Sequence, residues 1–397
     1  MKFSEKIEKM HYSPIRKLVP YLEEATNNGT KVYELHIGQP NIKTPDTFFD
    51  GLHEYKDNIV KYANSRGMDC LIQEFIQFYA NLGIDLNKDD ILITHGGSEA
   101  LTFAVMATCN KDDEILVLEP FYSNYDSFLK MSDANLVPIK LKFENEYKLP
   151  SFEELEALIT SKTKAILFSN PNNPLGTVLT EDEMKAICEL AVKHNLFIIA
   201  DEVYRTFIFE DVFYKSFMNM EEVKDRVILV DSISKHYSAC GARIGVIASK
   251  NKELTNLVLK LCQARLSVST IEQVATTKLL NTMESYLDDV VDKYKYRRDA
   301  MCAGLAEIDG VEFIKPKSAF YVFAKLPVDD TDRFAKWLLT DFSYDNETLS
   351  FAPGSGFYTD GVTGKNLARF SFCASKTEDI KKGMALLKIA LDEYNNI

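Results

Sequence analysis

The stretch VDSISKHYSACGARIGV, residues 230–246, places a lysine just after one apolar run and an arginine just before the next. Ser232 and Lys235 follow the first run, Gly241 loosens the backbone, and Arg243 precedes the second run. A solvated loop with two ordinary surface cations would explain most segments of this kind. The sequence on either side therefore decides between a surface loop and a binding site.

Six short runs rich in Ile, Leu and Val alternate with helical patterns along the middle of the chain. They are ILITHGG (91–97), EILVLEP (114–120), KAILFSNP (164–171), LFIIADEVY (196–204), RVILVDSIS (226–234) and RIGVIAS (243–249). Apolar runs without alternation are typical of strands covered on both faces. Capping boxes at 151–154 and 180–183 predict that helices begin there, in the stretches between the apolar runs. The pattern predicts an α/β fold with a mostly parallel sheet, which binds ligands at the carboxyl ends of its strands.

The C-terminal third has a different pattern. A long charged helical segment (about 280–308) precedes the strand-like SAFYVFAKLP (318–327). A second strand at ARFSFCAS (368–375) leads into a terminal helix that we expect Ser375 to cap. Fewer strands, interleaved with helices, predict a smaller α+β part.

Two strand ends carry groups suited to an anion and to a flat ring. HGGSEAL (95–101) opens a helix, whose free N–H groups and dipole attract an anion. Tyr122, in EPFYSNY, could stack on a flat ligand. A plain helix start and a core tyrosine are the alternatives.

Two further strand ends carry polar side chains. Asn173 lies in NPNNPLG (170–176), where asparagine often only forms a turn. Asp201 ends the apolar IIAD, and a buried carboxylate there requires a partner such as a cation. Tyr204 follows three residues later. Jointly, these clusters and residues 232–243 fit a planar, phosphorylated aldehyde with a basic ring nitrogen.

With these residues, the chain resembles the fold-type I pyridoxal-phosphate (PLP) enzymes, specifically the class I/II aminotransferases of the aspartate aminotransferase superfamily. The ordered set NPNNPLG, ADEVYR and SISKHYSACGARIGV is the most specific part, and IGQP (37–40), KYANSRGMDCLIQEF (61–75), SAFYVF, FAPGSGFY (351–358) and ARFSF accompany it. The resemblance implies a large domain with a mostly parallel seven-stranded sheet flanked by helices, plus a smaller α+β domain. We expect the large cofactor-binding domain at residues 45–285 and the small domain at 1–44 and 286–397.

The resemblance also implies roles for individual residues around pyridoxal 5′-phosphate. Lys235 would join the cofactor aldehyde as a Schiff base, and Asp201 would pair with the ring nitrogen. Tyr204 and Asn173 would bond the phenolic oxygen, and Tyr122 would stack on the ring. The phosphate would be held by Arg243, Ser232 and the backbone N–H groups of Gly97, Ser98 and Glu99.

Three further residues are implied to act on the substrate or on a second subunit. Arg369 would bind the substrate α-carboxylate with its two-pronged guanidinium. Asn173 would contact the substrate as well, and Gly38 would close over it. Tyr62 would reach the phosphate of the neighbouring subunit's cofactor, which implies a homodimer with shared active sites.

The implied activity is transfer of an amino group between an L-amino acid (an aspartate-type or aromatic donor) and a 2-oxo acid such as 2-oxoglutarate. The cycle would be ping-pong, through pyridoxamine phosphate. A PLP-dependent carbon–sulfur β-lyase uses the same lysine, aspartate and arginine, and the sequence does not separate the two. A PLP-binding transcription regulator is not expected, because the family pattern begins by Gly38 and leaves no room for a DNA-binding domain. For a second substrate carboxylate, the candidate cations are Arg16, Lys17, Arg66 and Arg265.

Composition restricts the remaining possibilities. The formal net charge of −13 disfavours nucleic acid as a partner. No apolar run approaches the ~20 residues that span a bilayer, and no secretory signal is expected. The seven cysteines are scattered singly, and the six histidines show no metal-binding spacing. We therefore expect a cytoplasmic protein without a metal site.

Overall fold

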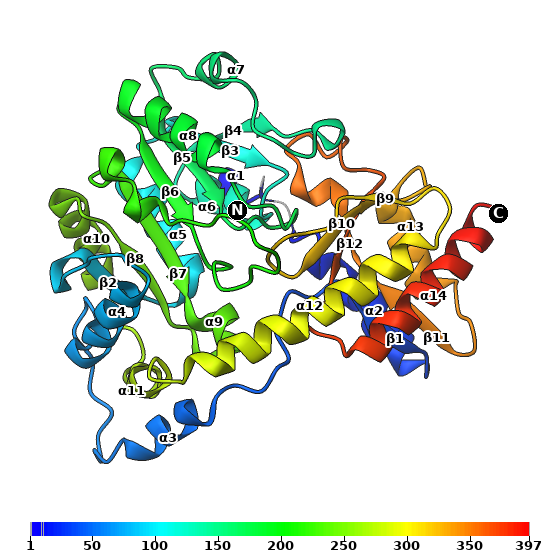
Figure 1. The fold of residues 1–397 in the computed structure, drawn as a ribbon, viewed down its shortest axis with the longest axis horizontal. Helices are drawn as coiled ribbons and strands as arrows, with labels where there is room; N and C mark the ends of the chain where they lie inside the picture. The colour runs from blue at the N-terminus through cyan, green and yellow to red at the C-terminus, as the bar shows by residue number, and fades with distance from the viewer. Residues whose placement is uncertain (1, 9, 11, 397) are drawn as a thin grey trace.

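The computed structural model describes residues 2–8, 10 and 12–396 of the chain. Its elements form two groups, which lie side by side in Figure 1. The long helix α12 (Glu284–Ala306), yellow in the figure, runs from the first group toward the second.

The first group is built on a seven-stranded sheet in the order β2-β8-β7-β6-β5-β3-β4. Its strands are β2 (Ile91–Thr94), β3 (Glu114–Glu119), β4 (Asn135–Lys140), β5 (Thr163–Ser169), β6 (Phe197–Asp201), β7 (Val227–Ser232) and β8 (Gly245–Ala248). All neighbours pair in parallel except β8, which is antiparallel to both β2 and β7. The mostly parallel sheet predicted from the sequence is confirmed.

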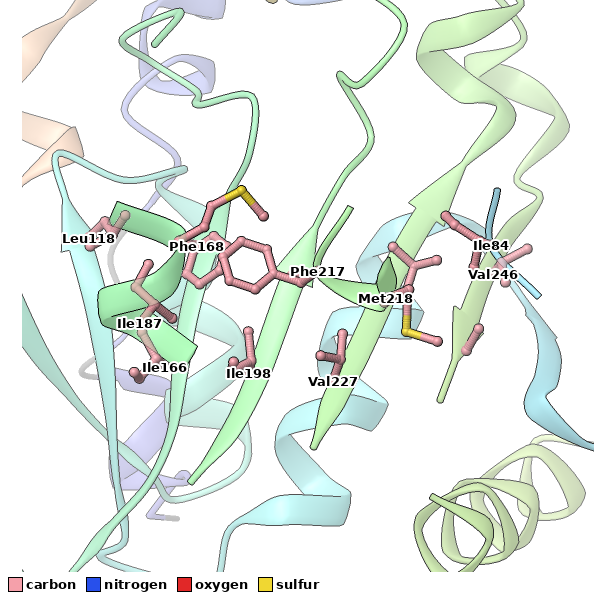
Figure 2. Packing of buried hydrophobic residues seen from close by; sticks show 14 of the residues in the cluster. Ile84, Leu118, Ile166, Phe168, Ile187, Ile198, Phe217, Met218, Val227 and Val246 are labelled. Atoms are coloured by element: carbon pink, nitrogen blue, oxygen red, sulfur yellow. The ribbon is translucent and has the colours of Figure 1, made fainter. Parts of the chain in front are cut away.

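Helices cover both faces of this sheet. One face packs against α5 (Gly96–Thr108), α6 (Asn124–Met131) and α10 (Lys252–Ala264). The other packs against α4 (Asp69–Asn81), α7 (Phe152–Glu156) and α8 (Glu181–Lys193). Figure 2 shows Ile166, Ile198 and Val227 of neighbouring strands packed in one apolar layer on this second face. Because residues alternate between faces along a strand, each strand supplies both layers.

Two further helices, α3 (Asp46–Glu54) and α11 (Thr270–Leu279), pack closely on each other. A side chain at Gly51 would come within 2.8 Å of the Ala275 backbone, so a glycine permits the approach.

The second group contains a four-stranded antiparallel sheet, β12-β13-β10-β9, and a parallel pair, β1-β11. The strands are β1 (Lys31–Glu34), β9 (Glu312–Phe313), β10 (Tyr321–Lys325), β11 (Glu347–Ser350), β12 (Ala352–Pro353) and β13 (Leu367–Ser371). Most of these strands share one apolar core with α2 (Val19–Asn27), α13 (Thr331–Thr340) and α14 (Thr377–Tyr394), whereas Ala352 of β12 packs in the core of the first group. This is the smaller α+β part expected from the sequence.

Two local differences from the sequence predictions have physical reasons. Strand β4 is absent from the six apolar runs because it lies at the sheet edge, where half-buried positions and Pro138 are tolerated. Helix α14 begins at Thr377 after Lys376, so Ser375 is not its cap. The Ser375 hydroxyl instead donates to the Glu34 carbonyl at 3.4 Å.

The division into 45–285 and 1–44 plus 286–397 remains our proposal. Strand β1 and helix α2 lie in the second group, as that division requires. The short helix α1 (Glu5–Glu8) instead lies against α6 of the first group, where Lys6 Nζ and Asp133 Oδ2 are 3.0 Å apart.

Candidate active site

A cavity of about 670 Å³ opens at the carboxyl ends of β5, β6 and β7, where the second group meets the first. Eleven of the thirteen residues assigned site roles from the sequence line it. They are Gly38, Gly97, Ser98, Tyr122, Asn173, Asp201, Tyr204, Ser232, Lys235, Arg243 and Arg369. The remaining two, Tyr62 and Glu99, do not.

Lys235 lies on α9 (Ile233–His236), a single turn directly after β7. Ser232 caps this turn, because its hydroxyl accepts the Ser234 N–H at 3.2 Å. The Lys235 amine donates to the Gly38 carbonyl at 2.7 Å. The fold therefore brings the lysine and the N-terminal glycine into one cavity, although 197 positions separate them.

Asp201 ends β6 and is only 4% exposed. The Tyr125 hydroxyl and the Val203 N–H donate to it, at 2.8 Å and 3.3 Å. Among the described residues no cation forms an ion pair with it, and burial raises its pKa to about 6. A buried carboxylate in this state favours a cationic ligand such as a protonated ring nitrogen.

Arg243 and the start of α5 form a cradle for an anion. The guanidinium donates to the carbonyls of Cys240 at 2.9 Å and His95 at 3.2 Å. Gly96 has a φ of 74°, and a side chain there would collide with the Arg243 guanidinium. The arginine can therefore approach the free N–H groups of the helix only because residue 96 is glycine. Ser232 lies beside them, and the donor set suits a phosphate.

Arg369 comes from β13 of the second group and is 1% exposed. It donates to Asn173 Oδ1 at 3.1 Å and to the His36 carbonyl at 2.9 Å, while its Nε has no hydrogen-bond partner among the residues that the structure describes. Its guanidinium carbon lies 4.2 Å from the centre of the Tyr321 ring. A buried arginine with an unpaired N–H at a cavity wall suits a ligand carboxylate.

Asn173 and the two tyrosines form a chain of contacts along the same wall. Asn173 Nδ2 lies 3.4 Å from the Tyr204 hydroxyl, which lies 3.0 Å from that of Tyr321. Burial raises the pKa of Tyr204 well above its ordinary value, so its hydroxyl keeps its proton. Tyr204 can thus act as a hydrogen-bond donor to an oxygen anion.

The three other predicted residues differ in their placement. Tyr122 lines the cavity, with its ring edge-on to Tyr125. The Glu99 side chain is occupied by the His95 N–H and by Arg265, so only its backbone N–H could serve an anion. Tyr62 is 82% exposed and lies outside this chain's cavity.

Tyr125, Tyr321 and His36 also contact site residues, although no role was expected of them from the sequence. Tyr321 stood within the quoted SAFYVF, which offered a signal for it. Tyr125 lies on α6, three residues after Tyr122. Its hydrogen bond to Asp201 forms only when α6 packs against the end of β6, so the sequence carries no signal for it. His36 contacts Arg369 through a backbone carbonyl, which no sequence pattern reports.

Of the four cations considered for a second carboxylate, only Arg16 lines the cavity. Lys17 forms an ion pair with Asp332, and Arg265 pairs with Glu99. Arg66 donates to the carbonyls of Asp89 and Ile91.

Within residues 2–8, 10 and 12–396, no three His, Cys, Asp or Glu side chains form a group suited to a metal ion. Over the same residues, no helix is both long and apolar enough to cross a membrane.

Residues 31–387 match the model of the family described as aminotransferase class I and II. The chain belongs to this family. A probable aspartate aminotransferase of Methanocaldococcus jannaschii is 31% identical over 363 residues, which cover 89% of this chain and 92% of that protein. The (5-formylfuran-3-yl)methyl phosphate transaminase of the same organism is 30% identical over 383 residues, 96% of each chain.

The crystal structure of an aspartate aminotransferase from Thermotoga maritima is similar, with a TM-score of 0.89 and 27% identity. The match covers 98% of this chain and 100% of that one. This aminotransferase is therefore a PLP-dependent enzyme acting on small molecules, with the fold that the sequence predicted. The cavity fits that cofactor, since it offers an unpaired buried carboxylate, an amine and an anion cradle.

Proposed function

We propose that this aminotransferase moves the amino group of an aspartate-type or aromatic L-amino acid to a 2-oxo acid such as 2-oxoglutarate, in a ping-pong cycle. The observation that carries the proposal is that Lys235, Asp201 and Arg369 line one cavity. They come from α9, β6 and β13, so two separate sheets contribute to the site.

We assign cofactor binding to the residues that surround the cavity. Lys235 would hold PLP covalently, Asp201 would pair with its ring nitrogen, and Tyr122 would stack on the ring. Asn173 and Tyr204 would bond its phenolic oxygen. Its phosphate would be bound by Arg243, Ser232 and the N–H groups of Gly97, Ser98 and Glu99.

When bound, PLP supplies an electron sink for the electron pair left as the substrate Cα–H bond breaks. The chain's own residues perform the remaining work. Arg369 binds the substrate α-carboxylate and orients the Cα–H bond. The Lys235 amine removes the proton from Cα and later returns one. Asp201 stays anionic beside the ring nitrogen and keeps it protonated, while Gly38 closes over the substrate.

Arg16 supports an acidic substrate. It lines the cavity, is exposed to solvent, and forms no ion pair among the described residues. Its neighbour Lys17 does not line the cavity and instead pairs with Asp332. We therefore assign the distal carboxylate of a dicarboxylic substrate to Arg16.

The placement of Tyr62 supports a homodimer with shared active sites. Its ring is exposed and does not line its own chain's cavity, which suits a side chain presented to the cofactor phosphate of a second copy. The seven unpaired cysteines support a reducing compartment, and we propose that the protein works in the cytoplasm.

A half-reaction assay tests the proposed activity. Addition of glutamate or aspartate to the holoenzyme, without an acceptor, should convert the bound aldehyde to its amine and release one equivalent of the 2-oxo acid. Release of pyruvate and ammonia from cystathionine, without that conversion, would support a carbon–sulfur β-lyase instead.

A further inference from the structure

Four buried polar side chains lie behind Lys235, on the far side of the sheet from α5. We call them the Asp231 cluster: Tyr79, Arg205, Asp231 and His236. Asp231 and Ser232 are adjacent in β7 and point to opposite faces. Leu229, on the Asp231 side, packs in the same core as Tyr79, whereas Val230 belongs to the other core. The Asp231 cluster therefore does not line the cavity.

Asp231 accepts hydrogen bonds from both sides of Lys235. Its Oδ1 accepts the Ser232 N–H at 2.8 Å and lies 3.0 Å from His236 Nε2. Its Oδ2 accepts the Tyr79 hydroxyl at 2.9 Å and forms an ion pair with Arg205. One carboxylate thus fixes the residue three positions before the lysine and the residue directly after it.

The protonation states of Asp231 and His236 determine which atom donates in each of these hydrogen bonds. Burial alone would raise the pKa of Asp231, but the Arg205 guanidinium, His236 and the Ser232 N–H together outweigh it and lower this pKa to about 2, so the carboxylate is anionic. Burial lowers the pKa of His236, so the ring is neutral at pH 7. Nε2–H then donates to Asp231, and the Thr206 hydroxyl donates to Nδ1 at 2.6 Å.

A four-residue helix cannot hold its own shape, because a single turn has too few internal hydrogen bonds. We propose that Asp231 is a positioning residue for Lys235, acting through His236 and the Ser232 N–H to set where the amine meets an aldehyde. This inference rests on the proposed role of Lys235. It gives a reason for a buried ion pair that would otherwise offer little net stability.

The test compares two amides at position 236. In His236→Gln the amide nitrogen can occupy the place of Nε2 and still donate to Asp231. In His236→Asn the amide reaches only the place of Nδ1, so that donor is lost. Tyr79→Phe is the matched control, since it removes a donor to Asp231 that does not bear on the turn of Lys235.

The main readout is independent of turnover. The holoenzyme is stripped of PLP, PLP is added back, and the borohydride-reducible link at Lys235 is followed by peptide mass spectrometry. We expect His236→Asn to form the link about tenfold more slowly, and His236→Gln to recover to within about threefold of the parent. In steady state, His236→Asn should lower kcat by a similar factor, with the KM for the amino donor within about twofold.

Tyr79→Phe should lower the thermal midpoint and leave the rate of link formation within about twofold. Equal rates for folded His236→Asn and the parent would overturn the inference, as would a His236→Gln no faster than His236→Asn. If His236→Asn does not fold, Thr206→Val serves as the second variant. It frees Nδ1, and we expect link formation about threefold slower, whereas an unchanged rate would overturn the inference. A parent protein that forms no link at Lys235 would instead refute the proposed function.

Discussion

The Tyr125 hydroxyl donates to Asp201 Oδ2 at 2.8 Å, at the buried end of strand β6. This bond holds the carboxylate toward the cavity but leaves its charge unbalanced by any ion pair among the described residues. The chain thus keeps a costly group in place, ready for a cationic ligand.

Replacement of Asp201 by Asn should stabilise the cofactor-free protein while removing activity. Burial raises the pKa of Asp201 from 3.8 to about 6, so the folded state holds an extra proton between these values. The parent's stability therefore falls as the pH rises through that window, by on the order of 3 kcal/mol. Denaturant unfolding of the parent and of Asp201→Asn at pH 7 and pH 4 measures the difference between their free energies of unfolding. The variant should be more stable than the parent at pH 7 and equally stable at pH 4. If parent and variant were equally stable at pH 7 as well, the shifted pKa of Asp201 would be contradicted.

Gly96→Ala should weaken PLP binding at least about tenfold, because a side chain at φ 74° would displace the Arg243 guanidinium. Gly241→Ala is the matched control. It lies two residues before Arg243, and a side chain there would meet no atom of the described part of the chain within 4 Å. Equilibrium titration of each stripped protein with PLP gives the two affinities. Equal weakening in both variants would argue against the cradle.

Arg369→Lys should lower kcat/KM for every amino donor by roughly 100-fold, because a lysine cannot form the two-pronged bond to a carboxylate. Arg333→Lys, at an exposed position on α13, controls for loss of a guanidinium and should have no effect. Steady-state kinetics with two donors of different side chain is the measurement. A loss confined to one donor would place Arg369 at the side chain rather than at the α-carboxylate.

Much of this site followed from the sequence because its residues stand directly after apolar strands. The positions of Asp201, Ser232 and Lys235 all depend on that local rule. Contacts between distant segments could not be predicted in the same way. The bond from Lys235 to Gly38 and the support of Asp231 by Tyr79 arise only when separate elements pack together.

For the fold, too, local patterns could be predicted from the sequence and contacts between distant segments could not. Six strands were visible as apolar runs, while β4 was not, since an edge strand with Pro138 lacks a continuous run. The prediction that Ser375 caps α14 was wrong, because the Ser375 hydroxyl donates to the carbonyl of Glu34, which lies in strand β1. The sequence could not distinguish Arg16 from the three other candidate cations. Only the lining of the cavity in the folded chain separates them.

Arg16→Ala should lower kcat/KM for aspartate or glutamate by about 10- to 100-fold, and for an aromatic donor by less than about threefold. Lys17→Ala is the neighbouring control, because its charge is engaged by Asp332 outside the cavity. The ratio of the two specificity constants is the relevant quantity. An unchanged ratio in Arg16→Ala would assign the distal carboxylate to another cation.

The most direct test of the whole account is borohydride reduction of the holoenzyme, followed by peptide mass spectrometry. One reduced pyridoxal-phosphate group should be attached to Lys235. The Lys235→Ala variant should fold, carry no such group and show no measurable turnover. A label on a different lysine, or full activity in Lys235→Ala, would contradict the role of Lys235.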